Sequence, residues 1–71
     1  MKDIFIKTVV EAVASKKATI AYNESLNKLT VGFDRKNETR TTVVDCTVDE
    51  YRQLTFLISF AKETRYHDLH L

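Results

Sequence analysis

The 71-residue chain has no proline and no tryptophan, and it contains only one glycine and one cysteine. Without a second cysteine an internal disulfide is excluded, and a lone thiol is typical of a reducing, cytoplasmic setting. A single glycine cannot build a glycine-rich phosphate-binding loop. The longest apolar runs fall far short of the ~20 residues that a membrane-crossing helix needs. The sequence therefore argues against three classes of protein: those held together by internal disulfides, those that bind nucleotides through a glycine-rich loop, and those that cross a membrane as a helix.

An excess of charge of one sign is also absent. Eleven basic and ten acidic residues give a formal net charge of +1, whereas a protein that binds nucleic acid by neutralising phosphates needs a basic field. A content of 44% hydrophobic and 30% charged residues is typical of a globular chain. We expect one domain, residues 1–71, whose core supplies only ~3–5 kcal/mol unless a partner chain adds to it.

An apolar repeat predicts a first helix over about residues 3–16, with Asp3 as its cap. The repeat consists of Ile6, Val9, Val10 and Val13. Residues 4–10 are also rich in β-branched side chains, which suit a strand, so the start of this segment has two interpretations.

Three strand-like segments follow, over residues 18–23, 29–34 and 39–46. The second has the clearest alternation, with Leu29, Val31 and Phe33 on one face. Residues 35–38 have the composition of a hairpin loop, and Asn37 is the residue best suited to a left-handed backbone.

A second helix is predicted from residue 47 to about residue 65. Thr47 and Glu50 have the spacing of a capping box, and Cys46 and Tyr51 occupy the two flanking staple positions. The order helix, three strands, helix predicts a small two-layer α+β domain. Its simplest form is a three-stranded antiparallel meander with both helices packed on one face.

Few residues offer chemistry. His67 and His70 supply at most two of the four ligands that a structural zinc site needs. Cys46 is expected to be a buried thiol rather than a nucleophile, because it lies on the predicted core face. We therefore expect no catalytic residues, no metal site and no cofactor, and a protein that is not an enzyme.

The order of elements is similar to that of double-stranded-RNA-binding domains, but the resemblance stops at topology. That family carries a Gly-Pro-x-His element between its first two strands, where this chain has residues 23–27. The family's second helix opens with lysines, whereas this one opens with Asp49 and Glu50. Nucleic acid remains an alternative partner, which a basic edge would bind: Lys16, Lys17, Arg35, Lys36 and Arg40.

The second helix carries one surface that its core stripe does not explain. That predicted stripe consists of Tyr51, Leu54, Leu57, Ile58 and Ala61. Phe56 and Phe60 are one turn apart and lie roughly 140° from its centre. Exposed apolar patches tend to mark interfaces, so we expect a partner interface here, with Gln53, Ser59 and Glu63 as its polar rim. The alternative is that the first helix or the C-terminal segment covers the two rings.

The sequence thus favours a non-enzymatic protein-interaction module that forms a homo-oligomer, most simply a homodimer, through the second helix. Its composition, poor in glycine, free of proline and rich in threonine and lysine, is typical of small accessory proteins of phages and other mobile elements. Such proteins often act as inhibitors of a host protein. The alternative is a weak nucleic-acid-binding or regulatory protein.

Overall fold

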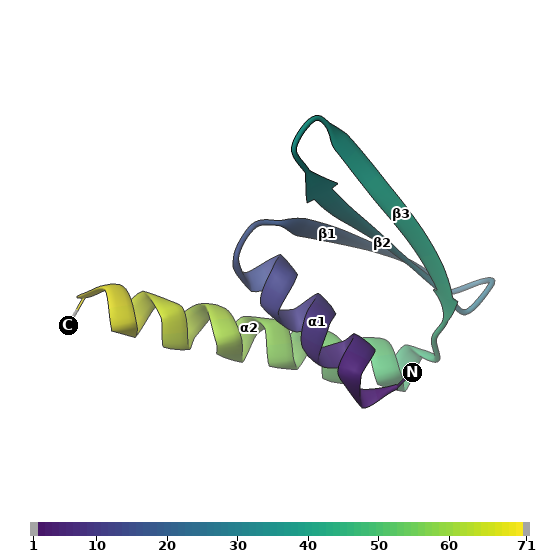
Figure 1. The fold of residues 1–71 in the computed structure, drawn as a ribbon. Coiled ribbons are helices and arrows are strands. Elements are labelled where there is room, and N and C mark those ends of the chain that lie inside the picture. The colour runs from purple at the N-terminus through teal and green to yellow at the C-terminus, as the bar shows by residue number, and fades with distance from the viewer. Residues whose placement is uncertain (1, 71) are drawn as a thin grey trace.

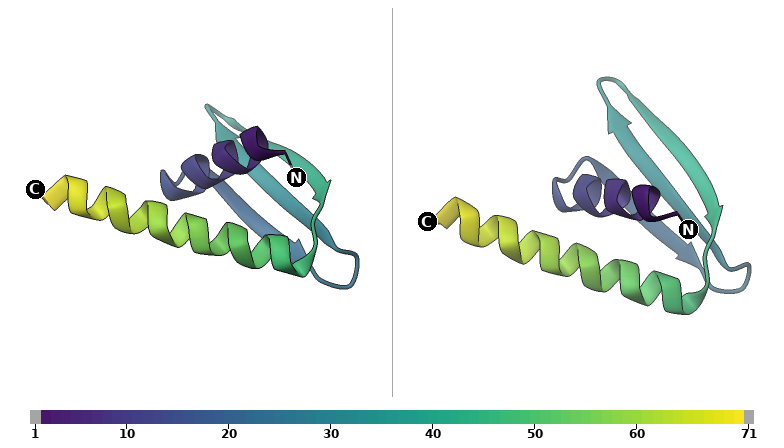
Figure 2. Two further views of the ribbon diagram at one scale, coloured as in Figure 1. Left: turned by 90° about the horizontal axis from the view of Figure 1, so that it is seen from below. Right: turned by 60° about the horizontal axis from the view of Figure 1, so that its bottom comes forward.

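The computed structural model describes the backbone of residues 2–70 and the side chains of residues 2–64. Its elements follow the predicted order: α1 (Asp3–Ala14), β1 (Ala18–Asn23), β2 (Lys28–Arg35), β3 (Glu38–Asp45) and α2 (Val48–His70). The strands form an antiparallel sheet in the order β1-β2-β3. Both helices lie on one face of it, and the far end of the β2–β3 hairpin stands clear of them (Figure 1 and Figure 2). The predicted α+β fold is therefore confirmed.

Alternation along the strands sorts the side chains between the two faces of the sheet. On the face toward the helices, Ile20 pairs with Val31 and Tyr22 pairs with Leu29. Seven described side chains are buried, which is a small core even for a domain of this size: Val9, Ala18, Leu29, Val31, Cys46, Leu54 and Ile58. The core therefore has little stability to spare.

The helix α1 ends in a Schellman motif. The N–H of Lys17 donates to the carbonyl of Ala12 at 2.8 Å, and that of Lys16 donates to the carbonyl of Val13 at 3.1 Å. This closure puts Lys16 at a φ of 62°, the left-handed conformation that glycine usually supplies at this position. The chain turns directly from this motif into β1.

The start of α1 differs from the expectation. The N-cap residue is Lys2, which makes no side-chain capping hydrogen bond, and Asp3 lies in the first turn. Asp3 still lies in the first turn, at the positive end of the helix, where a negative charge is favourable. The prediction that Asp3 caps this helix was wrong, and the segment is helical from Asp3 onward.

The helix α2 begins with the predicted capping box. The N–H of Glu50 donates to the Thr47 hydroxyl at 3.2 Å, and the N–H of Thr47 donates to the Glu50 carboxylate at 2.9 Å. This bond from the Thr47 backbone holds the pKa of Glu50 below its usual value. The contribution of Glu50 to stability is therefore present at neutral pH and is lost as the pH falls through the pKa of the folded state.

Two tyrosine rings join the start of α2 to the sheet. The ring of Tyr22 on β1 stacks on the ring of Tyr51 on α2, with centroids 4.4 Å apart and planes 8° from parallel. The Tyr22 hydroxyl donates to the Cys46 carbonyl at 2.9 Å, and the Cys46 N–H donates to the carbonyl of Asn27 at 2.9 Å. The junction between β3 and α2 is thus tied to β1 and to the β1–β2 loop.

The capping box gives a direct test of this junction. Thr47→Ala should lower the free energy of unfolding by about 0.5–2 kcal/mol, because the N–H of Glu50 loses its acceptor. Denaturant unfolding followed by circular dichroism measures the change. The matched control is Thr47→Ser, which keeps a hydroxyl and should stay close to wild type. An unchanged midpoint for Thr47→Ala would show that the box does not stabilise α2.

Candidate functional site

Phe56 and Phe60, called the Phe pair below, are exposed on α2. Their relative exposures are 69% and 63%, among the highest of the large apolar side chains that the structure describes. Among the described residues, neither α1 nor any other element covers them. The predicted orientation of the two rings is confirmed; their role as an interface remains a prediction.

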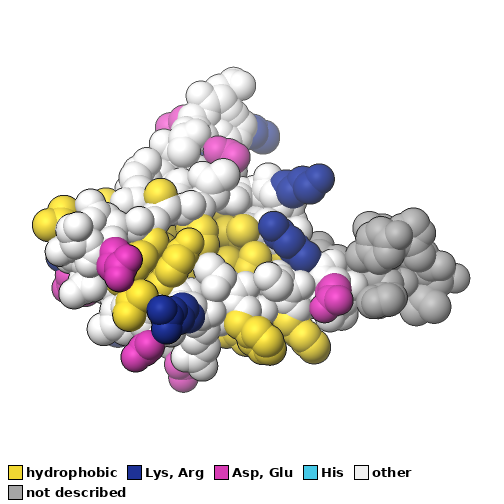
Figure 3. All heavy atoms as spheres, turned by 180° about the vertical axis from the view of Figure 1, so that it is seen from behind, with side chains coloured by type: hydrophobic (Ala, Val, Ile, Leu, Met, Phe, Trp, Pro, Cys, Tyr) yellow, Lys and Arg dark blue, Asp and Glu magenta, His cyan; other side chains and the backbone are white. Residues whose placement is uncertain are grey.

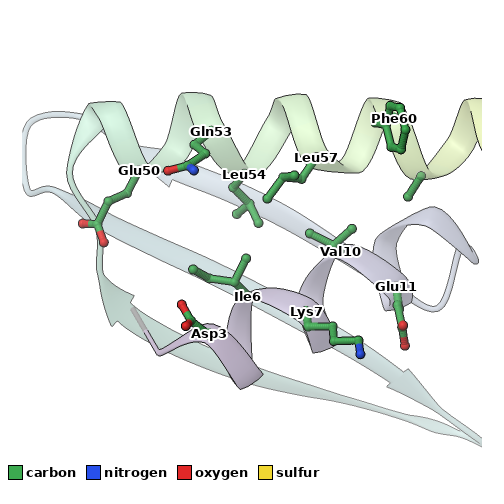
Figure 4. A pocket seen from close by; sticks show the side chains of 11 residues that line it. Asp3, Ile6, Lys7, Val10, Glu11, Glu50, Gln53, Leu54, Leu57 and Phe60 are labelled. Carbon is green, nitrogen blue, oxygen red and sulfur yellow. The ribbon is translucent and has the colours of Figure 1, made fainter.

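An open groove of about 860 Å³ runs between α1 and α2 beside the Phe pair. Ile6 and Val10 point into it from α1, and Leu54 and Leu57 point toward them from α2 (Figure 4). Phe60 lines the same groove, so one end of the Phe pair belongs to its wall. The groove and the pair therefore form one surface, called the apolar surface below.

The polar residues around the groove give it a sparse charged rim. Asp3, Lys7 and Glu11 line it on α1, and Glu50 and Gln53 line it on α2. On the face seen in Figure 3, apolar side chains gather along α2 and in the hollow beside it, with charged side chains around them. An apolar centre with a polar rim is the usual anatomy of a protein interface.

The groove corrects one detail of the predicted helix faces. Leu57 and Ala61 were expected in the core stripe with Leu54 and Ile58. Only Leu54 and Ile58 are buried, whereas Leu57 and Ala61 are half-buried and line the groove. Because Leu57 and Ala61 line the groove, apolar side chains of α2 extend without interruption from the core, through the groove, to the Phe pair.

The predicted basic edge is brought together at one end of the sheet. The N–H of Asp34 donates to the carbonyl of Lys17 at 2.9 Å, and Arg40 lies opposite Phe33 in the strand register. The basic end is defined as these five basic residues and two nearby carboxylates: Lys16, Lys17, Arg35, Lys36 and Arg40 with Asp34 and Glu38. These seven side chains have a net charge of +3 (five minus two).

The opposite end of the sheet, where α1 and α2 begin, carries the reverse charge. The acidic end is defined by five carboxylates that have two lysines among them: Asp3, Glu24, Asp45, Asp49 and Glu50 with Lys2 and Lys28. Lys28 and Asp45 form an ion pair across the strands. The near-neutral total charge thus conceals a separation of charge along the sheet.

Cys46 is 2% exposed. Burial raises the pKa of its thiol, and the carboxylate of Glu50 raises it further, so the thiolate that reacts or binds metals is disfavoured. Within residues 2–64, no three side chains of histidine, cysteine, aspartate or glutamate are placed to hold a metal ion. His67 and His70 lie outside the described side chains.

Neither helix, over the residues that the structure describes, is long and apolar enough to cross a bilayer. Comparison with protein-family models, with curated proteins and with solved structures found no match to this chain.

The burial of Cys46 makes a testable statement about its reactivity. In the folded protein a thiol reagent should label Cys46 much more slowly than in denaturant, because the thiol is enclosed and its pKa is raised. The rate should grow as the pH rises, since a raised pKa leaves less thiolate at neutral pH. Rapid labelling of the native protein at pH 7 would contradict the placement of Cys46 beneath the start of α2.

Proposed function

We propose that this protein is a non-enzymatic protein-interaction module that acts by burying its apolar surface against another polypeptide. The observation that carries the proposal is the exposure of Phe56 and Phe60 at 69% and 63% beside an open apolar groove. Fully burying one such side chain contributes roughly 1.5–3 kcal/mol. The same gain is a larger share of the total stability of a domain with so small a core.

Neither a disulfide nor, among the described side chains, a metal site stabilises this small domain, which supports the same proposal. The only cysteine of the chain is buried and unpaired, and the described side chains offer no metal cluster. A partner chain is the remaining common source of added stability for a domain of this size. The composition supports a role as a small accessory or inhibitory protein of a phage or another mobile element.

The Phe pair gives the test of this function. Phe56→Ser/Phe60→Ser should abolish association with the protein partner while leaving the far-UV circular dichroism unchanged, because both rings point away from the core. Leu26→Ser is the matched control, since Leu26 is a similarly exposed apolar residue in the β1–β2 loop, at 65%. Each variant is immobilised and compared with wild type for the proteins that it retains from an extract of the native host.

A result that contradicts the proposal is equally clear. If the double variant retains the same proteins as wild type and Leu26→Ser, the Phe pair is not the binding surface. If the double variant instead unfolds under conditions where wild type is a folded monomer, the two rings stabilise the chain internally, and the surface has no partner to explain it.

The basic end favours a second candidate function, binding to the phosphate backbone of a nucleic acid. Five basic side chains gather there, but Asp34 and Glu38 lie among them, and the acidic end would repel phosphates at the other side of the sheet. We therefore expect weak binding to duplex DNA or RNA at physiological salt.

This expectation is checked by titration at several salt concentrations. A variant with Lys16, Lys17, Arg35 and Lys36 changed to alanine should bind no differently from wild type if nucleic acid is not the partner. Sub-micromolar binding by wild type, with a steep salt dependence that the quadruple variant loses, would promote the second candidate over the first.

A further inference from the structure

The outward side of α2 carries a stripe that is apolar in the middle and polar at both ends. Phe56 and Phe60 occupy the middle, with Gln53 before them and Glu63 after them. Successive members are three, four and three residues apart, which is the spacing that keeps one seam of a helix turned toward a partner helix. The order of polar and apolar members, and the spacings between them, are the same when α2 is followed in either direction. A surface that packs against its own copy about a twofold axis needs this kind of symmetry.

Two exposed residues of opposite charge lie at the two ends of this stripe. Arg52 is next to Gln53, the first member of the stripe, and Glu63 is the last member. They are about 16 Å apart along the helix, too far to pair within one chain. Among the described side chains, neither takes part in an ion pair. Each is therefore available to a charge on another molecule.

We infer that the apolar surface is covered by a second copy of this chain, with the two α2 helices packed antiparallel through the Phe pair. The inference rests on the proposed function and names its partner. A twofold axis near residue 58 sets Phe56 against the partner's Phe60, and Gln53 against the partner's Glu63. The same axis brings Arg52 close to the partner's Glu63, and the symmetry makes each of these contacts twice.

Charge selects the antiparallel arrangement over the parallel one. In a parallel pair each residue meets its own copy. Arg52 would then face the partner's Arg52, and Glu63 would face the partner's Glu63. Contacts between like charges are unfavourable. A parallel pair would also place the two acidic ends side by side, because each α2 begins there. The antiparallel pair separates these ends and converts the flanking contacts into attractions.

The size of the patch predicts a weak dimer. A phenylalanine presents ~150–250 Å², so four of them, each about two-thirds exposed, bury roughly 400–650 Å². A stable interface buries more than ~1,000 Å², so the groove residue Leu57 and the polar rim must supply the rest. We therefore expect association that depends on protein concentration rather than a permanent dimer.

Analytical ultracentrifugation of the full chain, over a wide range of concentrations, is the first measurement. Wild type should pass from monomer to dimer as the concentration rises. Phe56→Ser/Phe60→Ser should weaken the dimer by more than ~10-fold, with an unchanged far-UV spectrum. Leu26→Ser should dimerise as wild type does.

Charge reversal then tests the direction of the helices. Arg52→Glu alone and Glu63→Arg alone should each weaken the dimer by roughly 3- to 10-fold, because each places like charges in contact. The combined Arg52→Glu/Glu63→Arg variant should regain the affinity of wild type, since both contacts are attractive again. Lys62→Glu, which changes a charge on another side of α2, is the matched control and should have no effect.

Each other outcome overturns a different statement. A dimer that the Phe pair controls, but that the combined charge variant fails to restore, rules out the antiparallel arrangement and leaves the proposed function standing. A wild type that stays monomeric at the highest concentration overturns the second copy as partner; the retention experiment above then decides the proposed function by itself. A dimer that the double phenylalanine variant does not affect lies elsewhere on the molecule and overturns the inference.

Discussion

The stacked rings of Tyr22 and Tyr51 and the capping box at Thr47 fix the direction in which α2 leaves the sheet. The chain passes from β3 to α2 through two residues, and both the hydroxyl bond to the Cys46 carbonyl and the box act on them. Because a helix is a rigid rod over several turns, a constraint at its first turn sets the position of every residue along it. The remaining surfaces of the molecule depend on that constraint.

With its direction fixed, α2 meets the shorter α1 along only part of its length. Leu54 and Ile58 then reach the core, Leu57 lines the groove beside α1, and Phe56 and Phe60 face outward. The helix therefore serves as a wall of the core, as a wall of the groove and as the outer surface. A rotation of α2 about its axis would exchange these roles, so the start of the helix controls what the protein can bind.

Local patterns in the sequence predicted the parts of this arrangement that depend on neighbouring residues. The capping box, the alternation through Leu29 and Val31, and the outward direction of Phe56 all follow from spacing within one element. The groove residue Leu57 could not be placed in this way, because its burial depends on how closely α1 approaches. The separation of charge along the sheet also required the strand register, which places Lys17, Asp34 and Arg40 at the same end of the sheet.

The tyrosine stack has a consequence for spectroscopy. The chain has three tyrosines and no tryptophan, so tyrosine dominates its absorption and emission in the near ultraviolet. Two of the three rings lie in face-to-face contact at 4.4 Å, a distance at which their electronic transitions couple and their emission is readily quenched. Most of the tyrosine absorption of this protein therefore comes from the point where α2 joins the sheet. Separation of the two rings relieves their quenching, so a rise in tyrosine emission reports the opening of that junction without any attached label.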